Sequence, residues 1–269
     1  AIVFKATDLL MRRVVAVKIL KDEISEDEQS VKRFENESRA VSMLSHQNIV
    51  NVYDVSTREN IKYIVMEFVE GITLKNYMEH REVLNLREII SYTTQILRAL
   101  DHAHKKGIIH RDIKPENIFV SASGNFKLGD FGIARTVEKT TGGLSKKGTY
   151  TYMAPEVYKG EKYGPTIDIY SLGIVLYRYL NNNRAPFLPQ PPAAITYGDN
   201  NIALSRRLEG ETIPAPVNAD TELAAVVLKA CAYNPKERYS SAAEMREDLE
   251  AIRDGKLPVY AFIPGTIIM

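Results

Sequence analysis

The 269-residue chain has one cysteine, no tryptophan, almost no net charge and no long apolar run. The single Cys231 excludes an intrachain disulfide and fits a reducing compartment, where we expect it to be a small buried apolar residue. No apolar stretch approaches the roughly 20 residues of a membrane span. A formal net charge of +1 creates no global field that would attract nucleic acid or an acidic membrane. We therefore predict a cytoplasmic domain that contacts neither, although the full-length chain could be membrane-anchored elsewhere.

The composition, 45% hydrophobic and 26% charged, is that of an ordinary globular protein with a sizeable core. The first ~70 residues alternate in the manner of strands and contain one helical pattern at 26–44. The predicted strands are 2–6, 14–20, 50–55 and 62–68. Gly71 then indicates a boundary between two lobes.

The remainder of the chain is mainly helical, interrupted by short strands at 117–120 and 126–129. Helices are predicted from Thr73 to about residue 80, from a capping box at Asn85 and Glu88 to Gly107, and at 168–180, 203–208, 221–232 and 242–253. His102 and His104 lie two apart, so they do not share a helix face and predict no metal site. This shift from strands to helices predicts an α+β fold of two lobes joined near residues 67–71.

The stretch from Ile109 to Phe119 contains the residue types that phosphoryl transfer needs. Asp112 can orient and deprotonate a hydroxyl, and Lys114 can neutralise charge on a phosphoryl group. Asn117 offers an amide oxygen to a hard cation. Taken alone, these would be solvated loop residues. Other motifs at suitable distances give them weight, namely Val-Ala-Val-Lys at 15–18, Asp-Phe-Gly at 130–132 and Ala-Pro-Glu at 154–156.

Together, in this order and spacing, the motifs resemble those of the eukaryotic-type protein kinases, and within them the Ser/Thr kinases of bacteria. The match covers nearly the whole chain. It implies a two-lobed protein-kinase fold over residues 1–269, with an N-lobe at 1–68, a hinge at 67–71, a C-lobe at 72–256 and a tail at 257–269. It also implies ATP and Mg²⁺ as cofactors, with Mn²⁺ as a possible substitute, and proteins as substrates.

The resemblance gives four side chains roles in binding the phosphates and the metal ions, directly or through a partner. Lys18 would hold the α and β phosphates, and Glu37, nineteen residues later, would pair with Lys18. Asp130 would bind a magnesium ion that bridges the phosphates, and Asn117 would bind a second one. These roles agree with a reaction in which the protein positions groups and neutralises charge.

The acceptor side is assigned by the same resemblance. Asp112 would take or orient the proton of the substrate hydroxyl, and Lys114 accompanies Ser/Thr rather than Tyr specificity in this family. Thr149, which follows Gly148, would bond Asp112 and Lys114 and shape the acceptor pocket.

The adenine base would lie between the apolar side chains of Val3, Ala16 and Phe119. Met66 resembles the gatekeeper, and the backbones of Glu67 and Val69 would bond the adenine edge. Each of the apolar side chains could equally be part of the hydrophobic core.

Several structural positions also follow from the resemblance. Asp168 would accept backbone hydrogen bonds from the catalytic loop, and Glu156 with Arg238 would form a buried ion pair. A stack that joins the lobes would contain Phe131, His110, Val41 and Val52.

Regulation by phosphorylation is a further expectation. Three arginines, Arg33, Arg111 and Arg135, would converge into a phosphate site. The hydroxyl-rich loop between the motifs offers Thr140, Thr141 and Ser145 as phosphate carriers. We expect autophosphorylation to order this loop; the alternative is three unrelated surface arginines.

The main departure from the family is the glycine-rich loop, which would precede Ala1 in a longer chain. Residues 187–213 form a longer segment than expected, suited to substrates or partners, and the apolar tail has no assigned role. Homodimerisation is possible through either lobe. A nucleotide-binding scaffold without activity is the alternative function, disfavoured because Lys18, Glu37, Asp112, Asn117 and Asp130 are all present. A small-molecule kinase is disfavoured by Gly148-Thr149 and Ala154-Pro155-Glu156.

Overall fold

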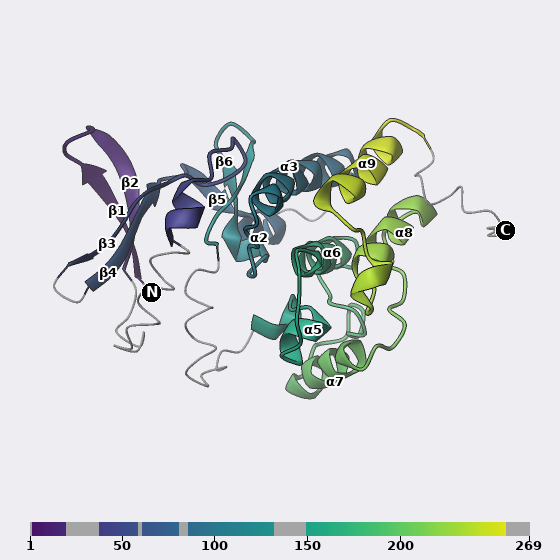
Figure 1. Ribbon diagram of the computed structural model, residues 1–269. Helices are drawn as coiled ribbons and strands as arrows, with labels where there is room; N and C mark the ends of the chain where they lie inside the picture. The colour runs from purple at the N-terminus through teal and green to yellow at the C-terminus, as the bar shows by residue number, and fades with distance from the viewer. Residues whose placement is uncertain (1, 20–37, 59–60, 81–85, 132–148, 257–269) are drawn as a thin grey trace.

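The computed structural model describes residues 2–19, 38–58, 61–80, 86–131 and 149–256. These residues form a strand-rich N-terminal lobe and a larger, mainly helical C-terminal lobe (Figure 1). The predicted α+β class and the two-lobed arrangement are therefore confirmed.

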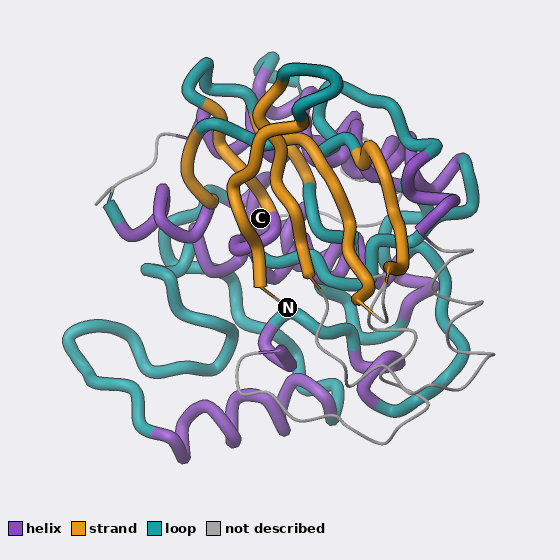
Figure 2. The backbone as a smooth tube through the Cα atoms, turned by 90° about the vertical axis from the view of Figure 1, so that its left-hand side faces the viewer, coloured by secondary structure: helices purple, strands orange, loops and turns teal. Residues whose placement is uncertain are grey.

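The N-terminal lobe is built on an antiparallel sheet that Figure 2 shows face on. Its order is β1-β2-β4-β3, so the last two strands exchange places relative to the sequence. The strands are β1 (Ile2–Asp8), β2 (Arg13–Ile19), β3 (Val52–Arg58) and β4 (Ile61–Glu67). All four predicted strands are present, with ends shifted by at most three residues. Of the predicted helix 26–44, only residues from 38 onward are described, and 38–42 are helical.

A second antiparallel sheet lies at the junction of the lobes, and its order is β5-β6-β7. Its strands are β5 (Gly71–Thr73), β6 (Ile118–Ser121) and β7 (Phe126–Leu128). Strand β5 was not predicted. A Cβ at Gly71 would lie 1.9 Å from the Val120 carbonyl oxygen, so the close approach of two strands requires this glycine. The link between β4 and β5 is residues 68–70, inside the predicted hinge.

The N-terminal lobe also joins this second sheet directly. The Leu128 N–H donates to the Asn48 carbonyl at 2.8 Å, and the Val50 N–H donates to the Leu128 carbonyl at 2.9 Å. The segment before β3 is thereby fixed beside the strand that leads to Asp130.

The C-terminal lobe is organised around one helix, α6 (Thr166–Tyr179), in which most side chains are buried, as its apolar sequence predicts. A Cβ at Gly173 on α6 would lie 2.8 Å from the Cys231 sulfur, which shows how closely α6 and α8 approach. Cys231 is buried as expected, and burial raises the pKa of its thiol to about 12. Helix α9 packs along α3. The helices are α2 (Leu74–Glu79), α3 (Leu86–Lys105), α5 (Pro155–Tyr158), α6 (Thr166–Tyr179), α7 (Tyr197–Leu208), α8 (Thr221–Ala230) and α9 (Ala242–Arg253). Short 3₁₀ turns are η1 (Pro115–Asn117), η2 (Thr149–Thr151) and η3 (Pro235–Glu237).

Capping explains where several helices begin and end. The Thr73 hydroxyl accepts the Asn76 N–H, as predicted, and Gly107 follows α3 with φ of 74°. The predicted start of α7 at residue 203 is wrong, because the helix begins at Tyr197. A capping box between Thr196 and Asp199 starts it, although the residues that follow have weak helix propensity.

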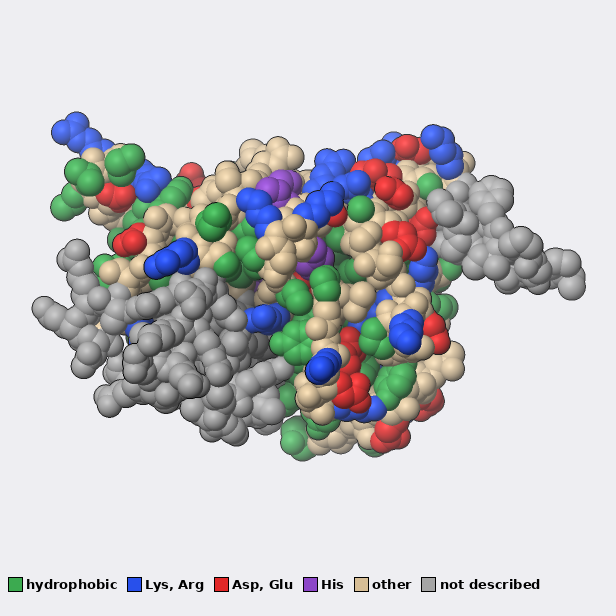
Figure 3. All heavy atoms as spheres, viewed as in Figure 1, with side chains coloured by type: hydrophobic (Ala, Val, Ile, Leu, Met, Phe, Trp, Pro, Cys, Tyr) green, Lys and Arg blue, Asp and Glu red, His purple; other side chains and the backbone are tan. Residues whose placement is uncertain are grey.

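Charged side chains of both signs are interspersed over α3 and α9 on the face that Figure 3 shows. Arg98 of α3 and Glu250 of α9 are 3.0 Å apart and link the two helices. Among the described residues, no helix combines the length and the apolar character needed to cross a bilayer.

Candidate active site

A single buried carboxylate anchors the loop that contains Asp112. Asp168 on α6 is 1% exposed and accepts the backbone N–H groups of His110 and Arg111, both at 2.8 Å. The predicted hydrogen bonds from the loop to Asp168 are therefore confirmed. His104 on α3 donates to the same carboxylate at 2.8 Å. Sequence reasoning missed this contact, because nothing local signals a partner 64 positions away.

Two residues of the site have a left-handed backbone that side chains other than glycine rarely adopt. The φ angles are 67° at Arg111 and 56° at Asp130. Such conformations cost on the order of 1–3 kcal/mol each and persist where surrounding contacts fix them. The bond from the Arg111 N–H to Asp168 is one such contact.

His110 is a fully buried neutral connector. Its Nδ1 accepts the Asp112 N–H at 3.2 Å, and its Nε2 donates to the Gly129 carbonyl at 2.9 Å. This pattern requires the neutral imidazole with its proton on Nε2. Burial lowers the pKa of His110 despite the nearby Asp168, which agrees with the neutral form.

Two members of the predicted stack between the lobes are in contact. The rings of His110 and Phe131 lie 4.5 Å apart between centroids. Val41 belongs to the same hydrophobic core as Phe131, and Val52 packs against it. The position of Asp112 is therefore tied to the packing of the residue that follows Asp130.

Asp112, Lys114 and Asn117 form one cluster. The Asp112 Oδ2 atom accepts Lys114 Nζ at 2.8 Å and Asn117 Nδ2 at 2.9 Å. The Asn117 amide also donates to the Asp112 carbonyl at 2.7 Å. A partly buried carboxylate held by a cation and an amide has a fixed orientation, which is the requirement for placing an acceptor hydroxyl.

A chain of contacts connects this cluster to Lys18. The Gly129 N–H donates to the Asn117 carbonyl at 2.9 Å, and Asp130 follows directly. The Asp130 carboxylate forms an ion pair with Lys18 of β2, 112 positions away. The structure thus brings together five of the predicted polar residues, Lys18, Asp112, Lys114, Asn117 and Asp130.

The oxygen atoms of this site suit a hard cation. The hydrogen bonds of the Asn117 side chain within the described residues come from its nitrogen, which leaves the amide oxygen available. The Asp130 side chain is 39% exposed, and Lys18 contacts one of its two oxygens. Mg²⁺ is usually held by one or two such side chains together with substrate phosphates, so these residues fit the ion. The same ligands suit Mn²⁺.

The strand register places the predicted nucleotide residues of the N-terminal lobe on one face of the sheet. Val3 lies opposite Lys18, and Ala16 lies opposite Met66. Opposed residues, and residues two apart on one strand, point to the same side. Val3, Ala16 and Met66 therefore share a face with Lys18.

The remaining predicted adenine contacts belong to β6, to the end of β4 and to the link between the lobes. Phe119 of β6 packs over Gly129, whose hypothetical Cβ would lie 2.7 Å from the ring. The Glu67 N–H already donates to the Asn51 carbonyl at 2.8 Å. Val69 is half-buried in the link between the lobes.

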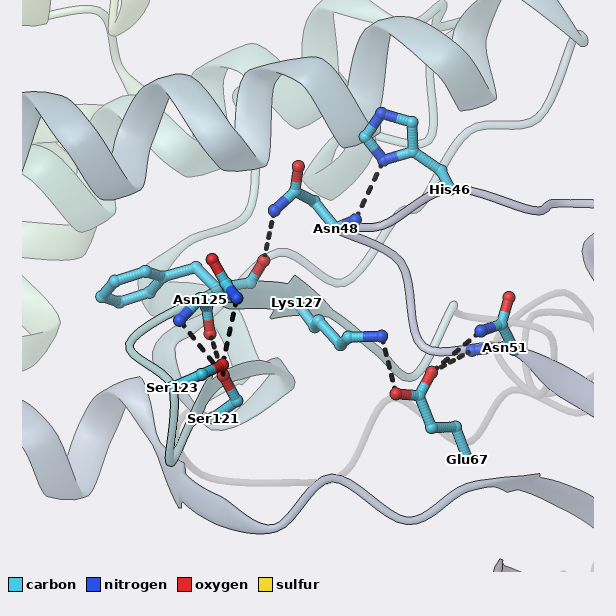
Figure 4. Close-up of polar contacts among 9 residues, drawn as sticks. His46, Asn48, Asn51, Glu67, Ser121, Ser123, Asn125 and Lys127 are labelled. Atoms are coloured by element: carbon cyan, nitrogen blue, oxygen red, sulfur yellow. Dashed lines mark hydrogen bonds and ion pairs between the residues drawn. The ribbon is translucent and has the colours of Figure 1, made fainter.

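The Glu67 side chain makes contacts that the sequence did not suggest (Figure 4). Its Oε1 atom lies 2.6 Å from Lys127 Nζ, and its Oε2 atom accepts the Asn51 side-chain amide at 2.9 Å. Lys127 is on β7, three residues before Asp130. This network links the end of β4 to the strand that leads into the candidate metal site.

The predicted ion pair of the C-terminal lobe is confirmed. The Arg238 guanidinium binds both oxygens of Glu156, at 2.6 and 2.8 Å, and both side chains are nearly inaccessible. Three further bonds satisfy the guanidinium, to the carbonyls of Ala232, Tyr233 and Thr166.

Several predicted site residues lie outside the described parts of the chain, namely Glu37, Arg33, Arg135, Thr140, Thr141 and Ser145. For Thr149 the structure describes the backbone, which begins η2. The Lys18–Glu37 pair, the three-arginine cluster and the acceptor-pocket role of Thr149 therefore stay predictions.

Comparisons with known proteins agree with this geometry. A family model for the protein kinase domain matches residues 1–249. The chain is 38% identical over 258 residues to a probable serine/threonine-protein kinase of Clostridium acetobutylicum, covering 94% of this chain and 38% of that protein. It is 37% identical to the serine/threonine-protein kinase PrkC of Bacillus subtilis, covering 94% and 38%. With PknB of Mycobacterium tuberculosis it shares 38% identity, covering 94% and 41%.

The fold has a solved counterpart as well. The kinase domain of Mycobacterium tuberculosis PknI superposes with a TM-score of 0.69 at 24% identity, covering 92% of this chain and 89% of that one. This similarity concerns the fold alone. The chain spans about two fifths of the length of the curated relatives.

Proposed function

This chain belongs to the protein kinase domain family, and from that premise we propose that it transfers the γ-phosphoryl group of ATP to Ser and Thr hydroxyls of proteins. The observation that carries the proposal is the convergence of Asp112, Lys114 and Asn117 with the Lys18–Asp130 pair. The proposal treats residues 1–269 as a kinase domain in the cytoplasm, with residues 67–71 as the hinge.

The nucleotide side of the reaction falls to Lys18 and Asp130. The Lys18 ammonium group contacts one oxygen of the Asp130 carboxylate, at a position where a metal ion could otherwise bind. When ATP binds, the Lys18 ammonium can turn to the α and β phosphates, whose negative charge replaces that of Asp130. Asp130 and the Asn117 amide oxygen would then hold Mg²⁺, which neutralises charge on the phosphates. Val3, Ala16, Met66 and Phe119 would bury the adenine base.

The acceptor side falls to Asp112 and Lys114. Asp112 would orient the attacking hydroxyl and accept its proton as its oxygen bonds the γ-phosphorus, while the bond from that phosphorus to the bridging oxygen breaks and ADP leaves. The Lys114 ammonium group, 2.8 Å from that carboxylate, would stabilise the negative charge on the oxygens of the phosphoryl group during transfer. The serine/threonine specificity in the names of the relatives supports the same acceptor class here.

We also propose that the loop before Thr149 is autophosphorylated, on Thr140, Thr141 or Ser145. The phosphate would pair with Arg111 and with the other two predicted arginines. Mass spectrometry of the protein expressed as wild type and as Asp112→Asn tests this. Phosphate on the wild-type loop alone supports the proposal, and an unmodified loop in both proteins rejects it.

The test of the proposed function uses the full-length protein, labelled ATP, magnesium and a generic basic acceptor protein, with Asp112→Asn as the matched control. The expected result is label on serine or threonine, lost in the variant and lost when magnesium is chelated. Nucleotide binding without transfer would identify a scaffold instead. Transfer to small molecules alone would identify another kinase class.

A further inference from the structure

The backbone of the short segment from Tyr150 to Tyr152 accepts hydrogen bonds from side chains of two helices. It includes most of η2 and follows Thr149 directly. Arg207 of α7 donates to the carbonyl of Tyr150 at 2.6 Å and also to the carbonyl of Thr151. Ser171 of α6 donates to the carbonyl of Tyr152 at 2.7 Å. Three successive carbonyls therefore accept hydrogen bonds from only two side chains.

Arg207 is an unusual residue for this position. It is 4% exposed, and its guanidinium lies 5.8 Å from the centre of the Tyr170 ring. Within the described parts of the chain it makes no ion pair with a carboxylate, so backbone carbonyls are its hydrogen-bond partners. Burial of an unpaired guanidinium is costly, and charge-assisted bonds to carbonyls offset that cost only while the segment keeps its path.

Its neighbour Arg206 provides a contrast. Arg206 is half-buried and forms a surface ion pair with Glu211. Two consecutive arginines of α7 thus differ. Arg206 binds an exposed carboxylate, and Arg207 binds the backbone that follows Thr149.

The held segment also lies near the catalytic loop. Tyr152 is buried, and its hydroxyl accepts a bond from Arg178 at the end of α6. Burial raises the pKa of Tyr152 to about 12, with a smaller contribution in the same direction from the Glu116 carboxylate. Glu116 belongs to η1 and directly precedes Asn117. Ser171 and Asp168 lie three positions apart on α6, and they bind Tyr152 and the backbone of His110 and Arg111 respectively, so one face of α6 holds both the segment and the catalytic loop.

We propose that Arg207 is a positioning residue for the protein acceptor, which it serves by fixing the backbone from Tyr150 to Tyr152 beside the catalytic loop. The inference rests on the proposed kinase function and deepens it. The guanidinium contacts neither nucleotide nor acceptor. It sets the path of the segment on which an acceptor peptide lies next to Asp112.

The proposal predicts separate effects on the two substrates. Loss of Arg207 removes two of the hydrogen bonds that fix the backbone from Tyr150 to Tyr152. Lys18 and Asp130, which serve the nucleotide, lie in a different part of the site. For Arg207→Met, which keeps the apolar stem and removes the donors, we expect the KM for a peptide to rise about tenfold or more. We expect the KM for ATP to stay within about twofold.

The experiment uses the full-length protein and a synthetic single-threonine peptide, chosen as the best wild-type acceptor from a random library. It compares wild type, Arg207→Met, Arg207→Lys and the control Arg206→Met, and it also measures slow ATP hydrolysis by water without peptide. The expected pattern is a raised peptide KM in Arg207→Met, partial recovery in Arg207→Lys, and unchanged ATP hydrolysis. Arg206→Met should match wild type.

A folded Arg207→Met variant with the wild-type peptide KM would overturn the proposal. So would equal losses in peptide transfer and in ATP hydrolysis, which would identify a general structural role. If Arg207→Met does not fold, Ser171→Ala removes the third carbonyl contact more mildly, and an unchanged peptide KM there counts against the proposal. Wild-type protein that phosphorylates no peptide would instead overturn the proposed function itself.

Discussion

Replacing Asp168 by asparagine tests how the catalytic loop is held. The carboxylate receives the N–H groups of His110 and Arg111 and the ring of His104, all at 2.8 Å. Asparagine has the same shape, but one acceptor oxygen becomes a donor and the charge is lost. A hydrogen bond to a charged group contributes about 1.5–3 kcal/mol, and a stranded buried donor costs about 1–3 kcal/mol. We therefore expect the free energy of unfolding to fall by about 3 kcal/mol.

The same substitution should slow the reaction by more than the loss of stability explains. Arg111 keeps its left-handed backbone, with φ of 67°, while Asp168 holds its N–H. Once that bond is weakened, the backbone can relax and carry the adjacent Asp112 away from its position. A displacement of about 1 Å can lower a rate about 100-fold. We expect kcat at saturating ATP and peptide to fall by about that factor.

Asp248→Asn is a matched control for the assay. Asp248 of α9 is 2% exposed and accepts the Tyr239 hydroxyl at 2.9 Å, away from the catalytic loop. Urea unfolding and kcat are measured for both variants. Asp248→Asn should lose stability and keep kcat within about twofold. The reasoning is refuted if Asp168→Asn, folded under assay conditions, also keeps its kcat.

Two further predictions concern the free energy of unfolding. Arg238→Met leaves the buried Glu156 carboxylate without its partner and should cost about 3–5 kcal/mol in urea unfolding. The double variant with Glu156→Met should cost less than Arg238→Met alone, and a larger cost would contradict this account of the pair. For His110, burial lowers the pKa in the folded state below the ordinary 6.5, so the unfolded state binds more protons below that pH. Its contribution to stability is complete above about pH 6.5 and declines as the pH falls. Between about pH 7.5 and 5.5, the unfolding midpoint of His110→Phe should therefore fall less than that of wild type, and equal declines would refute the assignment.

The residues whose roles were predicted from the sequence are those that occur in motifs. Asp112, Lys114 and Asn117 are close in the chain, and their cluster was expected from their residue types together with the other motifs at suitable distances. The Lys18–Asp130 contact spans 112 positions and was expected only in outline, as a shared site, through the family resemblance. The bonds to Asp168 and the Glu156–Arg238 pair were expected in the same way.

Contacts without a motif were not predicted. His104 and Arg207 lie on helices whose apolar pattern was recognised, but no periodicity shows that a polar side chain turns inward to a distant partner. Glu67 was considered for its backbone, while its carboxylate binds Lys127 across the two sheets. The early start of α7 was missed because a capping box outweighed weak local propensity. These features depend on tertiary packing, which one sequence does not specify locally.

The central claim is that Asp112 acts on the acceptor while Lys18 and Asp130 serve the nucleotide. The most direct test measures MgATP affinity and single-turnover transfer to a threonine peptide on the same preparation of Asp112→Asn. The account predicts wild-type affinity for MgATP with transfer slowed by about 100-fold or more. Transfer near the wild-type rate, or a loss of MgATP binding that accounts for the slower transfer, would contradict it.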